Sequence, residues 1–82
     1  MTEIETTTTI QIRLFAGLDK YAPALPDPYP IKPGTSFARL LKILAIPEDK
    51  ARLLFINGKK AGLQSILNGN ERIGIFPPVG GG

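Results

Sequence analysis

The chain has 82 residues, 43% of them hydrophobic and 21% charged, and a net charge of +3. This length allows one domain with one modest core, and the composition is typical of a globular protein rather than a disordered one. Because it contains no cysteine and no histidine, disulfide scaffolds, zinc fingers, iron–sulfur ligation and thiol nucleophiles are excluded, and the usual general base is missing.

The first predicted strand begins at Thr8. Before it, residues 1–7 carry Glu3, Glu5 and little apolar mass, so we expect a disordered leader. From Thr8 onward apolar and polar residues alternate, which predicts a strand with two different faces. One face carries Ile10, Ile12 and Leu14, and the other carries Gln11, Arg13 and Phe15. We expect the first face to point into the core.

Residues 17–33 form a long, proline-rich connection. The prolines are Pro23, Pro26, Pro28, Pro30 and Pro33. Each lacks a backbone donor and restricts the residue before it, which argues against a central strand. We predict a rigid loop with one helical turn at residues 18–21 and a short edge strand at residues 29–32. A ligand for a polyproline-reading domain is the functional alternative.

One amphipathic helix follows. Thr35 or Ser36 can cap its first turn, and Pro47 ends it. Helical spacing places apolar residues on one stripe and basic residues on the opposite side, with Ile43 on a flank. The stripe consists of Phe37, Leu40, Leu41 and Leu44, and the basic residues are Arg39 and Lys42. We interpret the stripe as core, because the sequence predicts no other helix to fill it.

Three more strands complete the predicted sheet. Residues 51–57 form a strand that is apolar on both faces, and Asn57-Gly58 folds it back into a short strand through residues 62–63. Residues 65–67 are predicted to be a connecting turn, and residues 68–70 reverse the chain into a last strand at 71–76. The inward residues are Leu54, Ile56, Ile73 and Ile75, and the outward ones are Leu53, Phe55, Arg72, Gly74 and Phe76.

This order of elements predicts an α+β roll, with one helix packed on a mixed four- or five-stranded sheet. We assign residues 8–76 to this domain and residues 77–82 to a flexible tail. Pro77 and Pro78 hold the root of the tail extended, and Gly80, Gly81 and Gly82 lack the Cβ that would keep them out of a narrow channel. Fully extended, the tail reaches about 20 Å. We therefore expect a protein that presents its own C-terminal carboxylate.

The chain from Thr8 onward resembles the MoaD/ThiS family of ubiquitin-like β-grasp sulfur carriers. The resemblance lies in the opening Ile-Arg-Leu-Phe-Ala at 12–16, the capped helix, the Phe-Ile-Asn-Gly turn at 55–58, and the ending Ile-Phe-Pro-Pro-Val-Gly-Gly-Gly at 75–82. Phe-Pro-Pro-Val is most similar to the small subunit of molybdopterin synthase. The third glycine is more common in the thiamine carriers, so the pathway stays open.

The resemblance implies a carrier, not an enzyme. An E1-like enzyme would use ATP and magnesium to adenylate the carboxylate of Gly82, and a persulfide donor would convert it into a thiocarboxylate. The acceptor would be an enzyme such as the large subunit of molybdopterin synthase or thiazole synthase. The chain itself would bind no cofactor and no metal. Pro77, Pro78 and Val79 would set the direction of the tail, and Gly80 and Gly81 would give access to partner channels.

A partner must also recognise the folded body. The outward residues Phe15, Leu53, Phe55 and Phe76 are predicted to share the sheet face opposite the helix, where exposed aromatic side chains commonly mark an interface. Arg13, Arg52 and Arg72 would surround this face and tune association. The alternative is that the proline-rich loop or the leader covers some of the aromatic residues.

Three other functions remain as alternatives. A ubiquitin-like modifier would join Gly82 to target lysines through the same adenylate. An RNA-binding β-grasp module would use the basic and aromatic residues but would leave the terminal glycines without a role. An independent enzyme is the weakest of these alternatives, because the sequence has few catalytic groups. The missing cysteines exclude a ferredoxin-type function. The sequence has no membrane span or signal peptide, so we expect a cytoplasmic protein.

Overall fold

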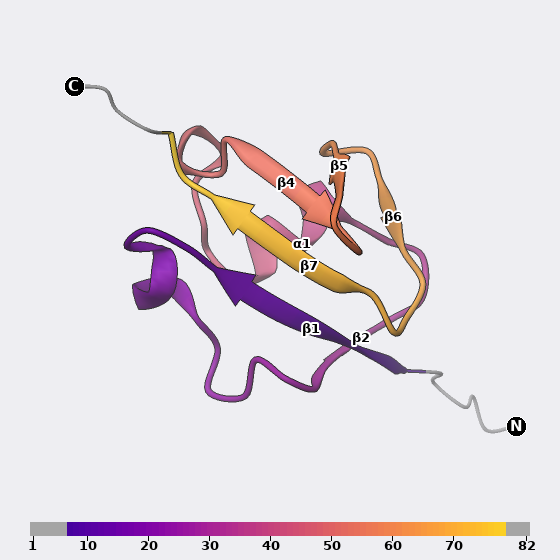
Figure 1. The fold of residues 1–82 in the computed structure, drawn as a ribbon. Coiled ribbons are helices and arrows are strands. Elements are labelled where there is room, and N and C mark those ends of the chain that lie inside the picture. The colour runs from indigo at the N-terminus through magenta and orange to yellow at the C-terminus, as the bar shows by residue number, and fades with distance from the viewer. Residues whose placement is uncertain (1–6, 79–82) are drawn as a thin grey trace, which may run out of the picture.

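The computed structural model describes residues 7–78 (Figure 1). Its strands are β1 (Thr8–Leu14), β2 (Tyr29–Ile31), β3 (Thr35–Ser36), β4 (Leu53–Ile56), β5 (Lys59–Ala61), β6 (Ile66–Leu67) and β7 (Arg72–Phe76). The helices are α1 (Phe37–Ile43) and two 3-10 turns, η1 (Leu18–Tyr21) and η2 (Glu48–Lys50). The predicted start of the first strand, the helical turn after it and the short strand at its edge are confirmed.

The five longer strands form a mixed sheet in the order β2-β1-β7-β4-β5. β1 and β7 lie parallel in the middle, and the other neighbours pair antiparallel. Figure 1 shows α1 behind this sheet, so one face is covered by the helix and the other is turned to the viewer. The predicted α+β architecture, with one helix on a mixed sheet, is confirmed in its five-stranded form.

The core lies between α1 and the covered face of the sheet. All four residues of the helical stripe are buried, and Phe37 has no exposed surface. The sheet contributes Ile10, Ile12, Leu54, Ile73 and Ile75, while Leu14 and Ile56 are half-buried against them. Ile31 of β2 and Leu67 of β6 add to the core, and Leu18, Ile46 and Ala51 complete it from the remaining segments. Within residues 7–78 no polar or charged side chain is buried.

Ser36, one of the two predicted caps, begins the helix. Its Oγ accepts a hydrogen bond from the backbone N–H of Arg39 at 3.1 Å, which satisfies one of the free amides of the first turn. The helix ends at Ile43, and Ala45 with a φ of 62° turns the chain away before Pro47. Ile43, expected on a flank, is 53% exposed.

The prediction of a connecting turn at residues 65–67 is wrong. Ile66–Leu67 is the strand β6, and it pairs antiparallel with β3 just before the helix. The backbone N–H of Phe37 donates to Ser65 O at 2.8 Å, and that of Ala38 donates to Leu63 O at 2.9 Å. Residues 63–67 therefore supply acceptors that the first turn of an isolated helix would lack.

The short strand after the Asn57-Gly58 turn is shorter than predicted. It ends at Ala61, because the N–H of Gly62 donates to Ser65 Oγ at 3.1 Å and closes a local turn instead of extending the ladder. The turn itself is confirmed: Asn57 has a φ of 53° and Gly58 a φ of 82°, the left-handed pair that a two-residue hairpin requires.

The reversal at residues 68–70 is held by one carboxylate. Glu71 accepts hydrogen bonds from the backbone N–H of Asn68 at 2.8 Å and of Gly69 at 2.7 Å. The N–H of Asn70 also donates to Thr9 O at 2.6 Å, which ties the reversal to β1. These bonds fix where β7 begins beside β1, and so they set the register of the two central strands.

Candidate functional site

The strand directions bring three of the four predicted partner-binding residues together at one end of the central strands. Because β1 and β7 run parallel, both stop at this end of the sheet, and the antiparallel β4 begins there. Phe15 directly follows β1, Phe76 is the last residue of β7, and Leu53 is the first of β4 and pairs with Phe76. Phe55 lies two residues further along β4, on the same face.

The backbone fixes Phe15 although it lies beyond the end of its strand. Its N–H donates to Ile75 O at 3.1 Å, which continues the ladder with β7 by one step. Its carbonyl accepts from the N–H of Leu18 at 3.2 Å, in a turn where Ala16 and Gly17 adopt positive φ. The side chain of Phe15 is therefore held on the outer face of the sheet and does not follow the loop.

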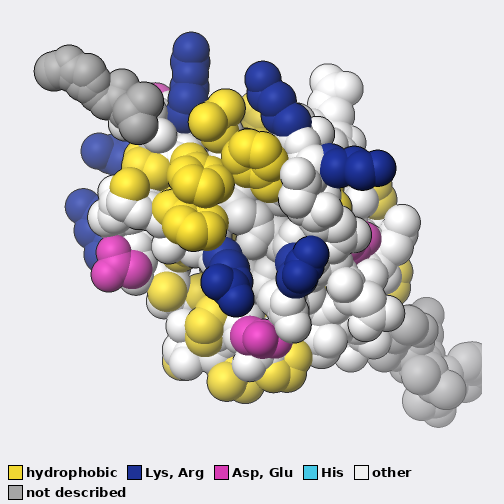
Figure 2. Space-filling view, viewed as in Figure 1, with side chains coloured by type: hydrophobic (Ala, Val, Ile, Leu, Met, Phe, Trp, Pro, Cys, Tyr) yellow, Lys and Arg dark blue, Asp and Glu magenta, His cyan; other side chains and the backbone are white. Residues whose placement is uncertain are grey.

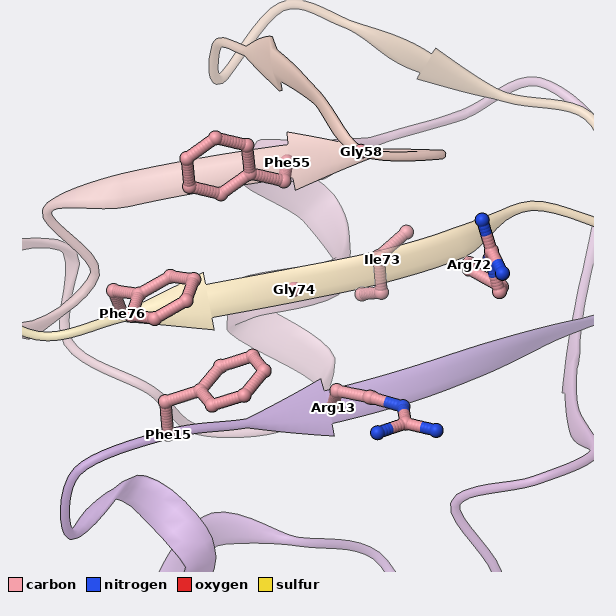
Figure 3. A pocket seen from close by; sticks show the side chains of 8 residues that line it. All are labelled: Arg13, Phe15, Phe55, Gly58, Arg72, Ile73, Gly74 and Phe76. Carbon is pink, nitrogen blue, oxygen red and sulfur yellow. The ribbon is translucent and has the colours of Figure 1, made fainter.

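Three phenyl rings form a cluster on this face. The rings of Phe15 and Phe76 are stacked, with centroids 4.2 Å apart and an interplanar angle of 4°. The ring of Phe55 meets that of Phe76 at 78°, with centroids 5.5 Å apart. Each phenylalanine is half-buried, whereas Leu53 beside them is 37% exposed. Figure 3 shows the rings of Phe55 on β4, of Phe76 at the end of β7, and of Phe15 just beyond the end of β1.

A hollow of about 400 Å³ lies next to the rings, and Gly74 lies within it between Phe55 and Arg13 (Figure 3). A Cβ at position 74 would lie 3.4 Å from the Phe15 ring, so the absence of a side chain leaves the space open. Sequence reasoning placed Gly74 on the outer face but missed its role. The signal was a glycine in an alternating strand with aromatic neighbours, which often marks close approach by another group.

Two arginines border the hollow. Arg13 on β1 and Arg72 on β7 are exposed, and both line it. In Figure 2, hydrophobic side chains gather over one end of the central strands and Lys and Arg side chains surround them. Arg52, the third predicted cation, is not among the lining residues. Its backbone N–H instead donates to Phe76 O at 2.9 Å.

The tail leaves the sheet from this surface. Pro77, half-buried, directly follows Phe76, and Pro78 is exposed. The predictions for Val79, Gly80, Gly81 and Gly82 lie outside the described residues. In the described part of the chain, β7 ends at Phe76, and the predicted tail begins at the next residue, Pro77.

Neither a metal site nor a membrane helix is found in the described part of the chain. Between residues 7 and 78 no three His, Cys, Asp or Glu side chains are close enough to hold a metal ion. No helix in this range has the length and hydrophobicity needed to cross a bilayer.

Comparison with known proteins identifies the fold. No protein-family model and no curated protein matches the sequence. Among solved structures, SAMP1 from Haloferax volcanii superimposes with a TM-score of 0.61 over 90% of this chain and 99% of the SAMP1 chain, at 20% sequence identity. The fold of this chain is thus the ubiquitin-like β-grasp.

Proposed function

We propose that this chain is a ubiquitin-like sulfur carrier that presents the carboxylate of Gly82 to an E1-like adenylating enzyme. The observation that carries the proposal is the position of the aromatic surface. Phe15, Phe55 and Phe76 cluster at the end of β7, and the strand continues directly into Pro77 and the glycine tail. A partner that binds the three rings would therefore also lie next to the start of the tail.

The chemistry needs activation from outside. A C-terminal carboxylate is ionised at neutral pH and is a poor electrophile. In the partner, its oxygen would attack the α-phosphate of ATP and release pyrophosphate, with Mg²⁺ supplied by the enzyme. The terminal sulfur of a persulfide would then displace AMP, and a thiol would cleave the resulting acyl disulfide to leave a thiocarboxylate. The chain contributes the carboxylate and a tail thin enough to enter the active site.

For the pathway, we propose molybdopterin biosynthesis. The Phe-Pro-Pro-Val segment at residues 76–79 supports this choice, because it resembles the small subunit of molybdopterin synthase. The acceptor would then be the large subunit of that synthase. Thiazole synthase is the acceptor if the triple glycine indicates the thiamine pathway instead.

Intact-mass spectrometry tests the carrier function. The full chain is incubated with an E1-like enzyme, ATP, Mg²⁺, a persulfide donor and a thiol. We expect a mass gain that matches one oxygen replaced by sulfur, localised to the peptide that ends in Gly82. Deletion of Gly82, or extension by one alanine, should abolish the gain while the fold is retained.

The other outcomes of this experiment contradict the proposal. An unmodified mass, with the same enzyme active on its own carrier, would refute activation by that class of enzyme. Thiocarboxylation of the Gly82 deletion would show that the tail glycine does not carry the group. An isopeptide bond between Gly82 and a lysine of a second protein, without a thiocarboxylate, would identify a protein modifier.

A further inference from the structure

We infer that the hollow over Gly74 receives one apolar side chain of a protein partner, and that Arg13 and Arg72 pair with carboxylates that flank it. This inference rests on the proposed function, because the partner is taken to be the E1-like enzyme. Beyond the proposed function, it specifies the chemistry of the partner surface, namely one protruding apolar side chain flanked by acidic residues.

The apolar half follows from the register of the sheet. Along one row, Arg13, Gly74, Phe55 and Lys60 lie opposite one another on neighbouring strands. Gly74 is the only member without a side chain, so the row has a gap in its middle. Phe15, Phe55 and Phe76 border this gap. The hollow of about 400 Å³ has room for a leucine, methionine or phenylalanine side chain. Pockets of this kind hold the anchor residues of protein interfaces.

The charged half follows from the surroundings of the arginines. Gln11 pairs with Arg72 and Arg13 pairs with Gly74, so the two arginines are diagonal neighbours on adjacent parallel strands. No acidic residue lines the hollow. Within residues 7–78 neither guanidinium makes an ion pair or a side-chain hydrogen bond. Asp27 lines a neighbouring hollow together with Arg72, but the two form no ion pair in the described part of the chain. Two adjacent cations that are not engaged in ion pairs favour an acidic partner, and the planar guanidinium fits carboxylates in pairs of hydrogen bonds.

The ring geometry favours a protein over single-stranded RNA. Bases stack on open aromatic faces. Phe15 and Phe76 cover one ring face of each other at 4.2 Å, and Phe55 packs against Phe76 at a steep angle. The cluster thus borders a hollow rather than forming a flat platform for successive bases. The net charge of only +3 agrees with a modest electrostatic contribution.

Three substitutions test the inference in the full chain. Gly74→Val places a branched side chain in the hollow, and since position 74 has no positive φ and the new Cβ makes ordinary contacts, we expect the fold to be retained. Arg13→Glu and Arg72→Glu reverse the two charges. Arg39→Glu is the matched control, because it makes the same charge change on the exposed side of α1.

Binding to an E1-like enzyme from the same organism is measured by calorimetry without ATP, and adenylation by ATP–pyrophosphate exchange. We expect Gly74→Val and each reversal to weaken binding about tenfold or more, and to raise KM for the carrier with kcat retained. Arg39→Glu should bind like the wild type. Binding of the wild type should weaken with salt, and less steeply after either reversal.

The outcomes separate this inference from the proposed function. Wild-type affinity of Gly74→Val would overturn the apolar half, and wild-type affinity of both reversals would overturn the charged half. Binding that these variants abolish, without any adenylation of the wild type, would support the surface and refute the carrier function. Tight, salt-sensitive binding of an oligouridine that Arg13→Glu abolishes, with no enzyme binding, would overturn a protein partner altogether.

Discussion

Phe55→Ala separates a binding role from a structural one. The side chain is half-buried on the outer face of β4, and its ring meets Phe76 at 5.5 Å. Removing it forfeits an aromatic pair, about 0.5–1.5 kcal/mol, and part of the apolar burial of one side chain. We therefore expect the free energy of unfolding to fall by about 1–2 kcal/mol, which lowers the melting temperature by roughly 4–15 °C.

The expected effect on binding is larger. If Phe55 borders the pocket of the interface, its truncation should cost about 2 kcal/mol or more in affinity for the E1-like enzyme, which is roughly a 30-fold rise in Kd. Urea denaturation gives the stability and titration calorimetry the affinity of the same preparation. Phe37→Ala provides the comparison for a core residue, since Phe37 is fully buried and its truncation should cost about 3–5 kcal/mol.

A large loss of stability without a loss of affinity would contradict a binding role for Phe55. If Phe55→Ala binds the enzyme as tightly as the wild type while its stability falls as far as that of Phe37→Ala, Phe55 is a core residue. The cluster at the end of β7 would then stabilise the sheet and would not be the contact surface.

Two stability predictions and one functional prediction accompany this one. Gly69→Ala should lower the free energy of unfolding by about 2–4 kcal/mol in urea denaturation, because Gly69 has a φ of 133° and a new Cβ would lie 2.8 Å from Thr8 Cγ2. Arg39→Glu should raise it by about 0.5 kcal/mol, since a glutamate three residues after the Ser36 cap completes a capping box at the positive end of the helix. An alanine added after Gly82 should leave the melting temperature unchanged and remove ATP–pyrophosphate exchange.

Gly58→Ala is the control for the first of these. Gly58 also has a positive φ, of 82°, but a Cβ there would meet nothing within 4 Å. It should therefore lose only the backbone contribution, about 1 kcal/mol. Equal losses in the two variants would show that contact with Thr8 contributes nothing. A stability loss in Arg39→Glu would contradict the capping argument.

Local sequence patterns predicted most of the elements, because alternation, helical spacing and turn residues each favour one kind of secondary structure. The alternation from Thr8 marked β1, the stripe beginning at Phe37 marked α1, and Asn57-Gly58 marked the hairpin. Each of these signals depends only on residues that are close together in the sequence. The missed strand β6 had no such signal, because Ile66–Leu67 is two residues long and is a strand only through its pairing with β3.

Of the candidate site, the sequence indicated which residues point outward but not which of them meet. Phe15, Phe55 and Phe76 lie on segments far apart in the chain. The contact of Phe15 with Phe76 depends on the parallel pairing of β1 with β7, and that of Phe55 with Phe76 depends on the antiparallel pairing of β4 with β7. The open space over Gly74 arises because its neighbours on both sides carry large side chains. Strand order and register decide such neighbours, and no local pattern encodes them.

The sequence by itself determined the amphipathic helix with two candidate caps, the inward and outward faces of the main strands, the tight hairpin, and the exclusion of thiol and histidine chemistry. Only the tertiary structure decided the five-strand order, the β3–β6 pairing, the cluster of rings at the end of β7 and the hollow over Gly74. The physical reason is the sequence distance over which each kind of interaction acts. Dihedral preferences, capping and burial periodicity act over a few residues, whereas a surface forms from whichever strands the whole core brings side by side.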